Sequence, residues 1–170
     1  MKESNSTQII IRKALKKDLP AIAEIAAKAF KNGPDAYWAV IGFKHAQRTF
    51  VAEVSGKIIG AVEIEVIRLG VHRHGHIGYI FVDPLFQRKG VGSMLAKKAE
   101  DFFMSKNAVA SWALTSPDNE GARKLFKRLG YEELTVNDVV RELGEINAEK
   151  LLRRMIYWEG DIILRKRLTN

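Results

Sequence analysis

A short stretch between two apolar runs carries two glycines, two cations and a glutamine. It runs from Val82 to Leu95 and has the sequence VDPLFQRKGVGSML. From Gly90 onward apolar residues recur at helical spacing, so the stretch leads a strand into the start of a helix. The first N–H groups of a helix lack partners within it, and together with the helix dipole they bind anions. The pattern therefore indicates a phosphate-binding corner, where glycines let a ligand approach the backbone.

The spacing around this corner excludes two common phosphate motifs. A Walker loop requires Gly-Lys-Ser/Thr, whereas Gly92 is followed by Ser93 and Met94. A dinucleotide fingerprint requires a third glycine at the position that Leu95 occupies. From the corner alone, an alternative stays open: a helix start whose glycines only relieve crowding.

Three histidines alternate along the chain at His72, His74 and His76, with Arg73 between the first two. In an extended chain their side chains share one face, which is a geometry that a metal site can use. The central arginine and the lack of an obvious carboxylate partner argue against that interpretation. We therefore expect no metal.

Two glutamates alternate with apolar residues in the predicted strand 57–67, where Glu63 and Glu65 flank Ile64. Such alternation predicts one buried face and one polar face. We expect the polar face to be solvated. The alternative is that both carboxylates line the site of an acceptor or relay a proton through water.

Composition bounds the class of protein. The chain has 170 residues, 46% of them hydrophobic and 28% charged, which is typical of one globular domain. It has no cysteine, so disulfides and thiolate metal sites are excluded and a cytoplasmic location is favoured. The N-terminal MKESNST lacks an apolar core, and no apolar run approaches the roughly 20 residues of a membrane span, so we expect no membrane partner.

The formal net charge of +8 indicates an anionic partner. Nucleic acid, a phosphate-rich cofactor and acidic lipid all satisfy that charge. A basic tail at 165–167 favours nucleic acid, but there is no helix-turn-helix signal and no interleaving of basic with aromatic residues. We therefore expect a function that requires no nucleic acid.

The periodicity predicts one α/β (α+β) domain with a mixed, mostly antiparallel sheet interrupted by helices. Residues 1–7 are expected to be disordered, and 137–156 to form a long connection before the last strand. Strands are predicted at 8–13, 49–54, 57–67, 76–82, 108–115, 134–140 and 161–168. Helices are predicted after an N-cap at Asp18, at 35–46, from Gly90, after an N-cap at Asp118 and at 148–155.

Two motifs in this order resemble the GNAT (GCN5-related) N-acetyltransferases. QRKGVG at 87–92 is similar to that family's Gln/Arg-x-x-Gly-x-Gly/Ala pyrophosphate loop, and the apolar strand with Val-Asp-Pro at 82–84 precedes it as in the family. Asn119, Ala122, Phe126 and Gly130-Tyr131 follow with the family's spacing. The resemblance extends over most of the chain.

The resemblance implies a fold in which two neighbouring strands splay apart to admit the pantetheine arm of coenzyme A. It implies acetyl-CoA as the acetyl donor. The expected cofactor-binding residues are Phe81, Val82, Gln87, Arg88, Lys89, Gly90, Val91, Gly92, Ser93, Asn119, Ala122 and Phe126.

Acetyl transfer to an amine requires a base for the ammonium proton and a donor for the oxyanion. On the resemblance, the base lies on the strand that contains His76, whose reference pKa of about 6.5 suits it to work near neutrality. The N–H of Val82 is the expected oxyanion donor. The alternative for His76 is an ordinary polar residue at the start of a strand.

Phe126 departs from the family pattern, because many members carry a tyrosine there as the acid that protonates the leaving thiolate. If the coenzyme thiol resembles cysteine, protonating its thiolate at pH 7 is worth only about 2 kcal/mol. Water, Tyr131 and Tyr157 are alternative proton sources. YWEGDIIL at 157–164 also resembles the end of RimI/Ard1-type protein N-terminal acetyltransferases, in which a tyrosine-bearing loop touches the peptide.

The expected function is therefore acetyl transfer from acetyl-CoA to a primary amine, with the N-terminal α-amine of a protein or peptide favoured. His76, Val82 and Tyr157 are the candidate catalytic residues. Two alternatives remain open: acetylation of a small-molecule amine, and a non-catalytic domain that binds coenzyme A. A homodimer is also compatible with the sequence.

Overall fold

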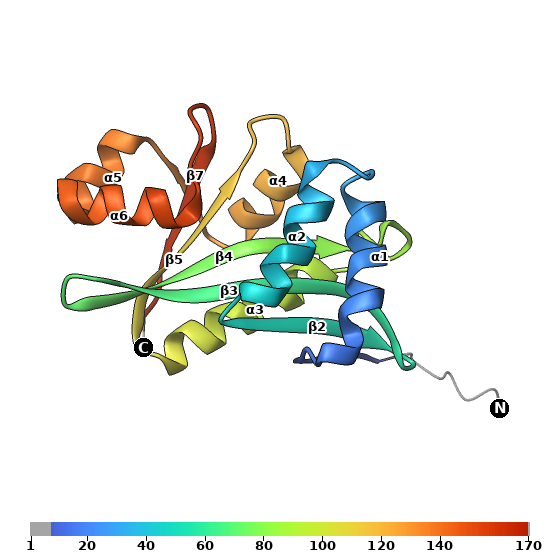
Figure 1. Ribbon diagram of the computed structural model, residues 1–170. Coiled ribbons are helices and arrows are strands. Elements are labelled where there is room, and N and C mark those ends of the chain that lie inside the picture. Colours follow the sequence, from blue (N-terminus) through green and yellow to red (C-terminus); the bar gives the residue numbers. More distant parts are fainter. Residues whose placement is uncertain (1–7, 170) are drawn as a thin grey trace. The chain divides into compact units, whose positions relative to one another are not determined.

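A computed structural model describes residues 8–169, so the segment 1–7, expected to be disordered, lies outside the described residues. The fold is mixed α/β, with seven strands in one sheet in the order β1-β2-β3-β4-β5-β7-β6, and helices flank the sheet (Figure 1). The predicted fold class is confirmed. The residues form two compact units, described separately below: the first comprises the chain up to Glu63 with Tyr79–Lys98, and the second Ile64–Gly78 with the chain from Ala99 onward.

The first unit holds two helices that lie side by side, α1 and α2 (Figure 1). Their apolar faces pack on strand residues that include Val51, Ala61 and Phe81. The elements that begin in this unit are β1 (Ile9–Lys13), a 3₁₀ turn (Lys16–Asp18), α1 (Leu19–Ala29), α2 (Pro34–His45), β2 (Arg48–Val54), β3 (Lys57–Leu69), a second 3₁₀ turn (Pro84–Phe86) and α3 (Val91–Ser105). Strands β3 and β4 and helix α3 each pass from one unit into the other.

Asp18 occupies the N-cap position of α1, as predicted, but its side chain does not cap the helix. Its carboxylate instead accepts hydrogen bonds from the Arg12 guanidinium at 2.7 Å and from the N–H of Leu15 at 2.7 Å. Arg12 holds the pKa of Asp18 below its usual range, although burial alone would raise it. The residue therefore ties the end of β1 to the start of α1.

The second unit contains the remaining elements, and its core joins Trp112 on β5 to side chains of the last two helices. Strand β5 pairs in parallel with β4, and the paired residues run from Arg73 with Ala108 to Ile77 with Ala113. Strand β4 continues to Val82. The family resemblance predicts that the two strands separate beyond Ile77. The elements are β4 (His72–Val82), β5 (Ala108–Thr115), α4 (Glu120–Arg128), β6 (Glu132–Leu134), α5 (Val136–Leu143), α6 (Glu145–Met155) and β7 (Ile162–Arg167).

The strand predicted at 134–140 is wrong, because β6 ends at Leu134 and α5 begins two residues later. Thr135 and Asp138 form a reciprocal capping box that starts α5. Val139 and Leu143 then lie four residues apart on the face that packs on the core of the second unit. The segment 137–156 thus holds most of α5 and all of α6.

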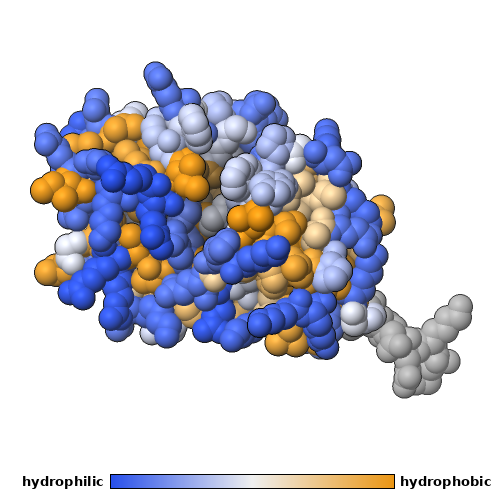
Figure 2. Space-filling model, viewed as in Figure 1, coloured by the Kyte–Doolittle hydropathy of each residue, from blue (hydrophilic) through white to orange (hydrophobic). Residues whose placement is uncertain are grey.

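The basic last strand β7 is neutralised by carboxylates of its own unit. Arg165 pairs with Glu142 at 2.8 Å and Glu132 at 3.3 Å, and Lys166 pairs with Glu100 at 2.7 Å. Hydrophilic side chains cover much of the face in Figure 2, with apolar residues in separate patches. Within residues 8–169, no helix is long and apolar enough to cross a membrane.

Candidate active site

The glycine corner has the backbone of an anion site. The first helical hydrogen bond of α3 runs from the N–H of Met94 to the carbonyl of Gly90 at 3.0 Å. The N–H groups of the three preceding residues, 91–93, therefore have no acceptor within the helix. Gly90 has a φ of 82° and Arg88 a φ of 61°, so the chain turns into the helix through left-handed backbone that glycine adopts without strain.

Two side chains fix the conformation of the loop between β4 and this corner. The carboxylate of Asp83 accepts a hydrogen bond from the N–H of Leu85 at 3.0 Å. The side-chain amide of Gln87 donates to the carbonyl of Val82 at 3.0 Å. Gln87, expected as a donor to phosphate, here links the loop to the end of β4.

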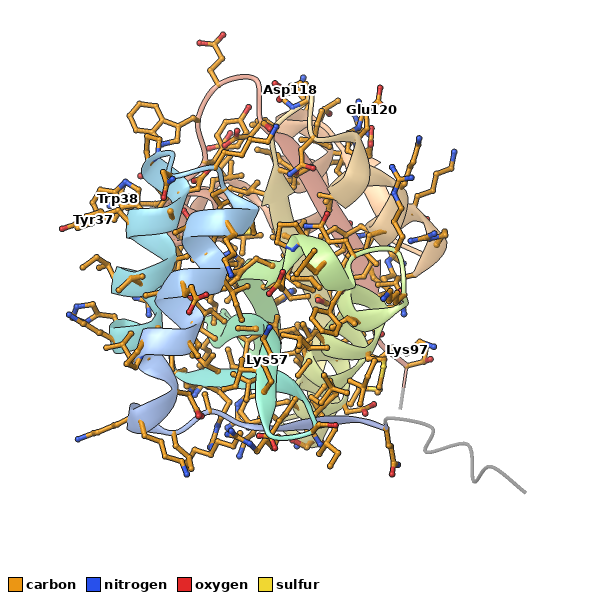
Figure 3. The ribbon with its side chains drawn as sticks, turned by 90° about the vertical axis from the view of Figure 1, so that its right-hand side faces the viewer. Tyr37, Trp38, Lys57, Lys97, Asp118 and Glu120 are labelled. Carbon is orange, nitrogen blue, oxygen red and sulfur yellow. The ribbon has the colours of Figure 1, made fainter. Side chains whose placement is uncertain are left out.

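Positive charge gathers beside the corner in the first unit. The ammonium groups of Lys89 and Lys57 lie 5.5 and 5.6 Å from the ring centre of Phe86. Figure 3 labels Lys57, which begins β3. Sequence analysis missed Lys57 because thirty residues separate it from the loop, and only the sheet brings the two together. Phe81 and Val82, the expected pantetheine contacts, are buried at the end of β4.

In the second unit, His76 is part of a chain of three polar groups. Its Nδ1 lies 3.1 Å from Oε1 of Glu65 on β3. The other carboxylate oxygen, Oε2, accepts two hydrogen bonds from the guanidinium of Arg154 on α6, at 2.9 and 3.0 Å. Burial would raise the pKa of Glu65, but its contacts with His76 and Arg154 lower that pKa below its usual value.

This arrangement is compatible with the predicted role of His76 as a base. A carboxylate that holds one imidazole nitrogen fixes the ring and leaves the other nitrogen free to exchange a proton with a substrate. Glu65 therefore does not lie on a solvated face, although the alternating sequence predicted one. Its position across a tight hairpin from His76 was a signal that sequence analysis could have used. Arg154 gave no such signal, because it lies in a helix far along the chain.

The histidine run does not form a shared metal site. The ring of His74 is buried, and its Nδ1 accepts a hydrogen bond from the indole N–H of Trp112 at 3.0 Å. Burial lowers the pKa of His74 to about 4, so it is neutral near pH 7. No group of three or more metal-ligating side chains occurs among the described residues.

The start of α4 corrects one predicted cap. Its N-cap is Asn119 rather than Asp118, since the Asn119 side-chain oxygen accepts a hydrogen bond from the N–H of Ala122 at 3.1 Å. Asp118 and Glu120, labelled in Figure 3, flank it. The amide nitrogen of Asn119 is not used by the cap, so it remains available to a ligand.

Phe126 and Tyr131 belong to the core of the second unit. Phe126 is buried, and its ring centre lies 4.8 Å from that of Tyr131 in an edge-to-face contact. The hydroxyl of Tyr131 is buried and donates to Oγ of Ser111 at 2.6 Å. Because burial raises the pKa of Tyr131 and its proton is held by Ser111, it is a poor proton source for a thiolate. Tyr157 is half-buried just after α6 and remains the better candidate.

Two curated relatives are similar to this chain. An uncharacterized N-acetyltransferase of Methanocaldococcus jannaschii is 32% identical over 139 residues, which cover 74% of this chain and 62% of the relative. The chain thus spans less than two thirds of that relative's length. A ribosomal protein bS18-alanine N-acetyltransferase of Salmonella typhimurium is 37% identical over 57 residues, which cover 34% of this chain and 38% of the relative.

Two solved structures share the fold. The PaiA N-acetyltransferase of Thermoplasma acidophilum, in complex with coenzyme A, has a TM-score of 0.71 at 16% identity and covers 95% of this chain and 99% of its own. Ard1 of Thermoplasma volcanium also has a TM-score of 0.71, at 17% identity, with coverage of 95% and 99%. At these sequence identities, the similarity shows only that the fold is shared.

A family model described as the acetyltransferase (GNAT) family matches residues 14–131. This match covers more than half of the chain, and it includes the glycine corner, the strand that carries His76 and the start of α4. The chain therefore belongs to the GNAT family of acetyltransferases.

Proposed function

We propose that this chain transfers the acetyl group of acetyl-CoA to the N-terminal α-amine of a protein or peptide. The observation that carries the proposal is the corner at the start of α3, which presents three helix N–H groups without helical acceptors behind a left-handed Gly90. The relative named as a bS18-alanine N-acetyltransferase supports a protein N-terminus as the acceptor.

The residues present fit a diphosphate ligand. The N–H groups of residues 91–93 and the positive end of the α3 dipole suit a doubly charged anion. Lys89 and Lys57 add charge beside them. On this proposal the pyrophosphate of coenzyme A binds at the corner, Phe81 and Val82 bind the pantetheine arm, and Asn119 binds the arm through its free amide nitrogen.

The chemistry assigns one role to each polar group. The ammonium group of the acceptor gives one proton to His76, and the neutral nitrogen then attacks the thioester carbonyl and releases its second proton to water as the amide forms. The carbon–sulfur bond then breaks, so that the acetyl group stays on nitrogen and the coenzyme leaves as a thiolate. Glu65 holds the imidazole in place, and Arg154 holds Glu65. The N–H of Val82 stabilises the oxyanion. Water or Tyr157 protonates the thiolate.

The test is thiol release from acetyl-CoA with a pair of peptides. One peptide has a free N-terminus and the other carries the same sequence with a formylated N-terminus, and neither contains lysine. We expect rapid release of thiol with the first peptide and background release with the second. Equal rates would exclude an N-terminal acceptor. Release only with free small amines would indicate the small-molecule alternative, and no release with any amine would indicate a non-catalytic coenzyme A domain.

A further inference from the structure

The first unit contains a buried carboxyl group that the proposed mechanism does not use. Glu63 on β3 is only 3% exposed, although its alternation with apolar neighbours predicted a solvated face. Neither of its side-chain oxygens has a hydrogen-bond partner within residues 8–169. Burial raises the pKa of Glu63 to about 9, so the group is protonated near pH 7. A buried carboxyl without partners is costly, which makes a functional role worth testing.

The face of α2 above this carboxyl is made of small residues. Ala39 is fully buried, and Gly42 lies three residues further along the same face. A methyl group added at Gly42 would lie 2.2 Å from Oε1 of Glu63, so the carboxyl occupies the space that a side chain at Gly42 would need. The helix therefore accommodates a polar group at a position where an apolar side chain would fill the core.

A second carboxylate and a phenol accompany Glu63. Asp35, seven residues before Gly42 and thus on the same side of α2, accepts a hydrogen bond from the hydroxyl of Tyr79 at 3.1 Å. Burial raises the pKa of Tyr79, and the charge of Asp35 and its hydrogen bond raise that pKa further. Helix α1, which packs in the same core cluster, contributes the apolar Ile22, Ile25 and Ala26.

A cation with several N–H donors matches these groups. The oxygens of Glu63 have spare lone pairs in surroundings where a charge pair is poorly screened. The exposed carboxylate of Asp35, which accepts from Tyr79, adds a negative charge on the same side of α2. An anion would be repelled by Asp35. A primary ammonium group is compact and carries three donors, whereas the planar guanidinium group is larger.

We propose that Glu63, together with Asp35 and Tyr79, forms the binding site for the primary ammonium group of the acceptor. This inference rests on the proposed function, because an acetyltransferase that acts on α-amines must recognise such a group. Tyr37 and Trp38 lie on the exposed side of α2 and point away from its buried face (Figure 3). They are therefore suitable positions for control substitutions.

The experiment follows the carboxyl carbon of Glu63 by ¹³C NMR in protein without acetyl-CoA. Glu63→Gln identifies the resonance, and Glu24→Gln, at an exposed position on α1, is the matched control. The pH titration is recorded with propylammonium chloride, with sodium chloride at equal ionic strength, and with 1-propanol. We expect propylammonium to lower the midpoint by about one pH unit or more, because a cation beside a carboxylate favours its charged form. Neither control solute should move it.

A second variant keeps the charge but disturbs the site. Gly42→Ala should push the carboxyl of Glu63 aside and abolish most of the propylammonium effect, whereas Tyr37→Ala on the exposed side should leave the effect intact. The inference would be overturned if the titration midpoint of Glu63 did not change with propylammonium, or if it changed equally with 1-propanol. If peptides are nevertheless acetylated at their N-termini, only this inference fails. If the resonance responds but no peptide is acetylated, the proposed function fails instead.

Discussion

At the scale of single residues, the two groups to which we assign roles in the chemistry differ in their partners. His76 is held by Glu65, which is held in turn by Arg154. Glu63, two positions from Glu65 on the same strand, has no partner within residues 8–169 and is kept neutral by burial. A carboxyl with partners can position a base, whereas one without partners is poised to bind a cation. The strand thus places two chemically different carboxyl groups two positions apart.

The contacts of His76 predict how strongly three substitutions should lower turnover. His76→Ala should lower kcat about 100-fold or more at neutral pH, because a general base contributes about that much, and should leave acetyl-CoA affinity unchanged. Glu65→Gln and Arg154→Ala should give smaller losses, because they remove contacts that hold the imidazole in place and leave the imidazole itself. Arg153→Ala is the matched control, since Arg153 pairs with the exposed Glu149 on the same helix. Parental rates and pH profiles in His76→Ala would show that His76 is structural.

The burial of Glu63 makes a prediction about stability. Its pKa is raised from 4.5 in the unfolded chain to about 9 in the folded protein, so the folded state retains a proton that the unfolded state loses. The stability that this retained proton gives to the folded state is fully present below about pH 4.5 and is lost as the pH rises toward 9. Relative to Glu63→Gln, the parent should lose up to about 1.4 kcal/mol of unfolding free energy per pH unit in this range. Urea denaturation at several pH values measures this. A constant difference between the two proteins would contradict the burial argument.

At the scale of elements, the helices and strands with strong periodicity were predicted within a few residues. The strand at 108–115 matches β5 in full, and the helix from Gly90 matches α3. Helix α5 was missed because its valines favour a strand, while its Thr-x-x-Asp capping box and the spacing of Val136, Val139 and Val140 specify a helix. The capping box was the local signal that could have corrected the prediction.

Sequence analysis recognised the corner at α3 because its glycines and cations are adjacent in the chain. The partners of His76 and the burial of Glu63 are set by which strand lies beside which and by which helix covers them. The residues next to His76 and Glu63 in the sequence do not reveal which strands and helices pack against them. Glu63 and Glu65 look alike in the alternating pattern, yet one is covered by the small residues of α2 and the other pairs with α6.

The corner itself is tested by a charge placed at the start of α3. Gly92→Asp should bring a carboxylate to the N–H groups that we propose bind pyrophosphate, and coenzyme A affinity should fall about tenfold or more through repulsion and competition for those groups. The fold should survive, because an acidic residue is favourable in the first turn of a helix. Calorimetry measures the affinity and circular dichroism the fold. Unchanged affinity in a folded variant would remove the pyrophosphate assignment.

At the scale of the whole molecule, the net charge of +8 does not by itself identify a partner. Cations of the last strand, Arg165 and Lys166, are paired with carboxylates of the same unit, which weakens the case for a nucleic-acid surface. Lys57 and Lys89 lie beside the corner instead. The charge is therefore better explained by a phosphate-bearing cosubstrate, and the family match agrees with this explanation.

The choice of acceptor follows from the proton that it must lose. An α-amine has a reference pKa near 8 and a lysine near 10.4, a difference of about 3.3 kcal/mol in the cost of presenting a neutral amine at neutral pH. A single positioned histidine should therefore act best on the amine that deprotonates more easily. The most direct measurement is tandem mass spectrometry of one peptide that carries both a free N-terminus and an internal lysine, after incubation with the protein and acetyl-CoA. We predict acetyl groups on the N-terminal nitrogen in large excess over the lysine; acetylation mainly on the lysine, or none on the peptide, would contradict the account.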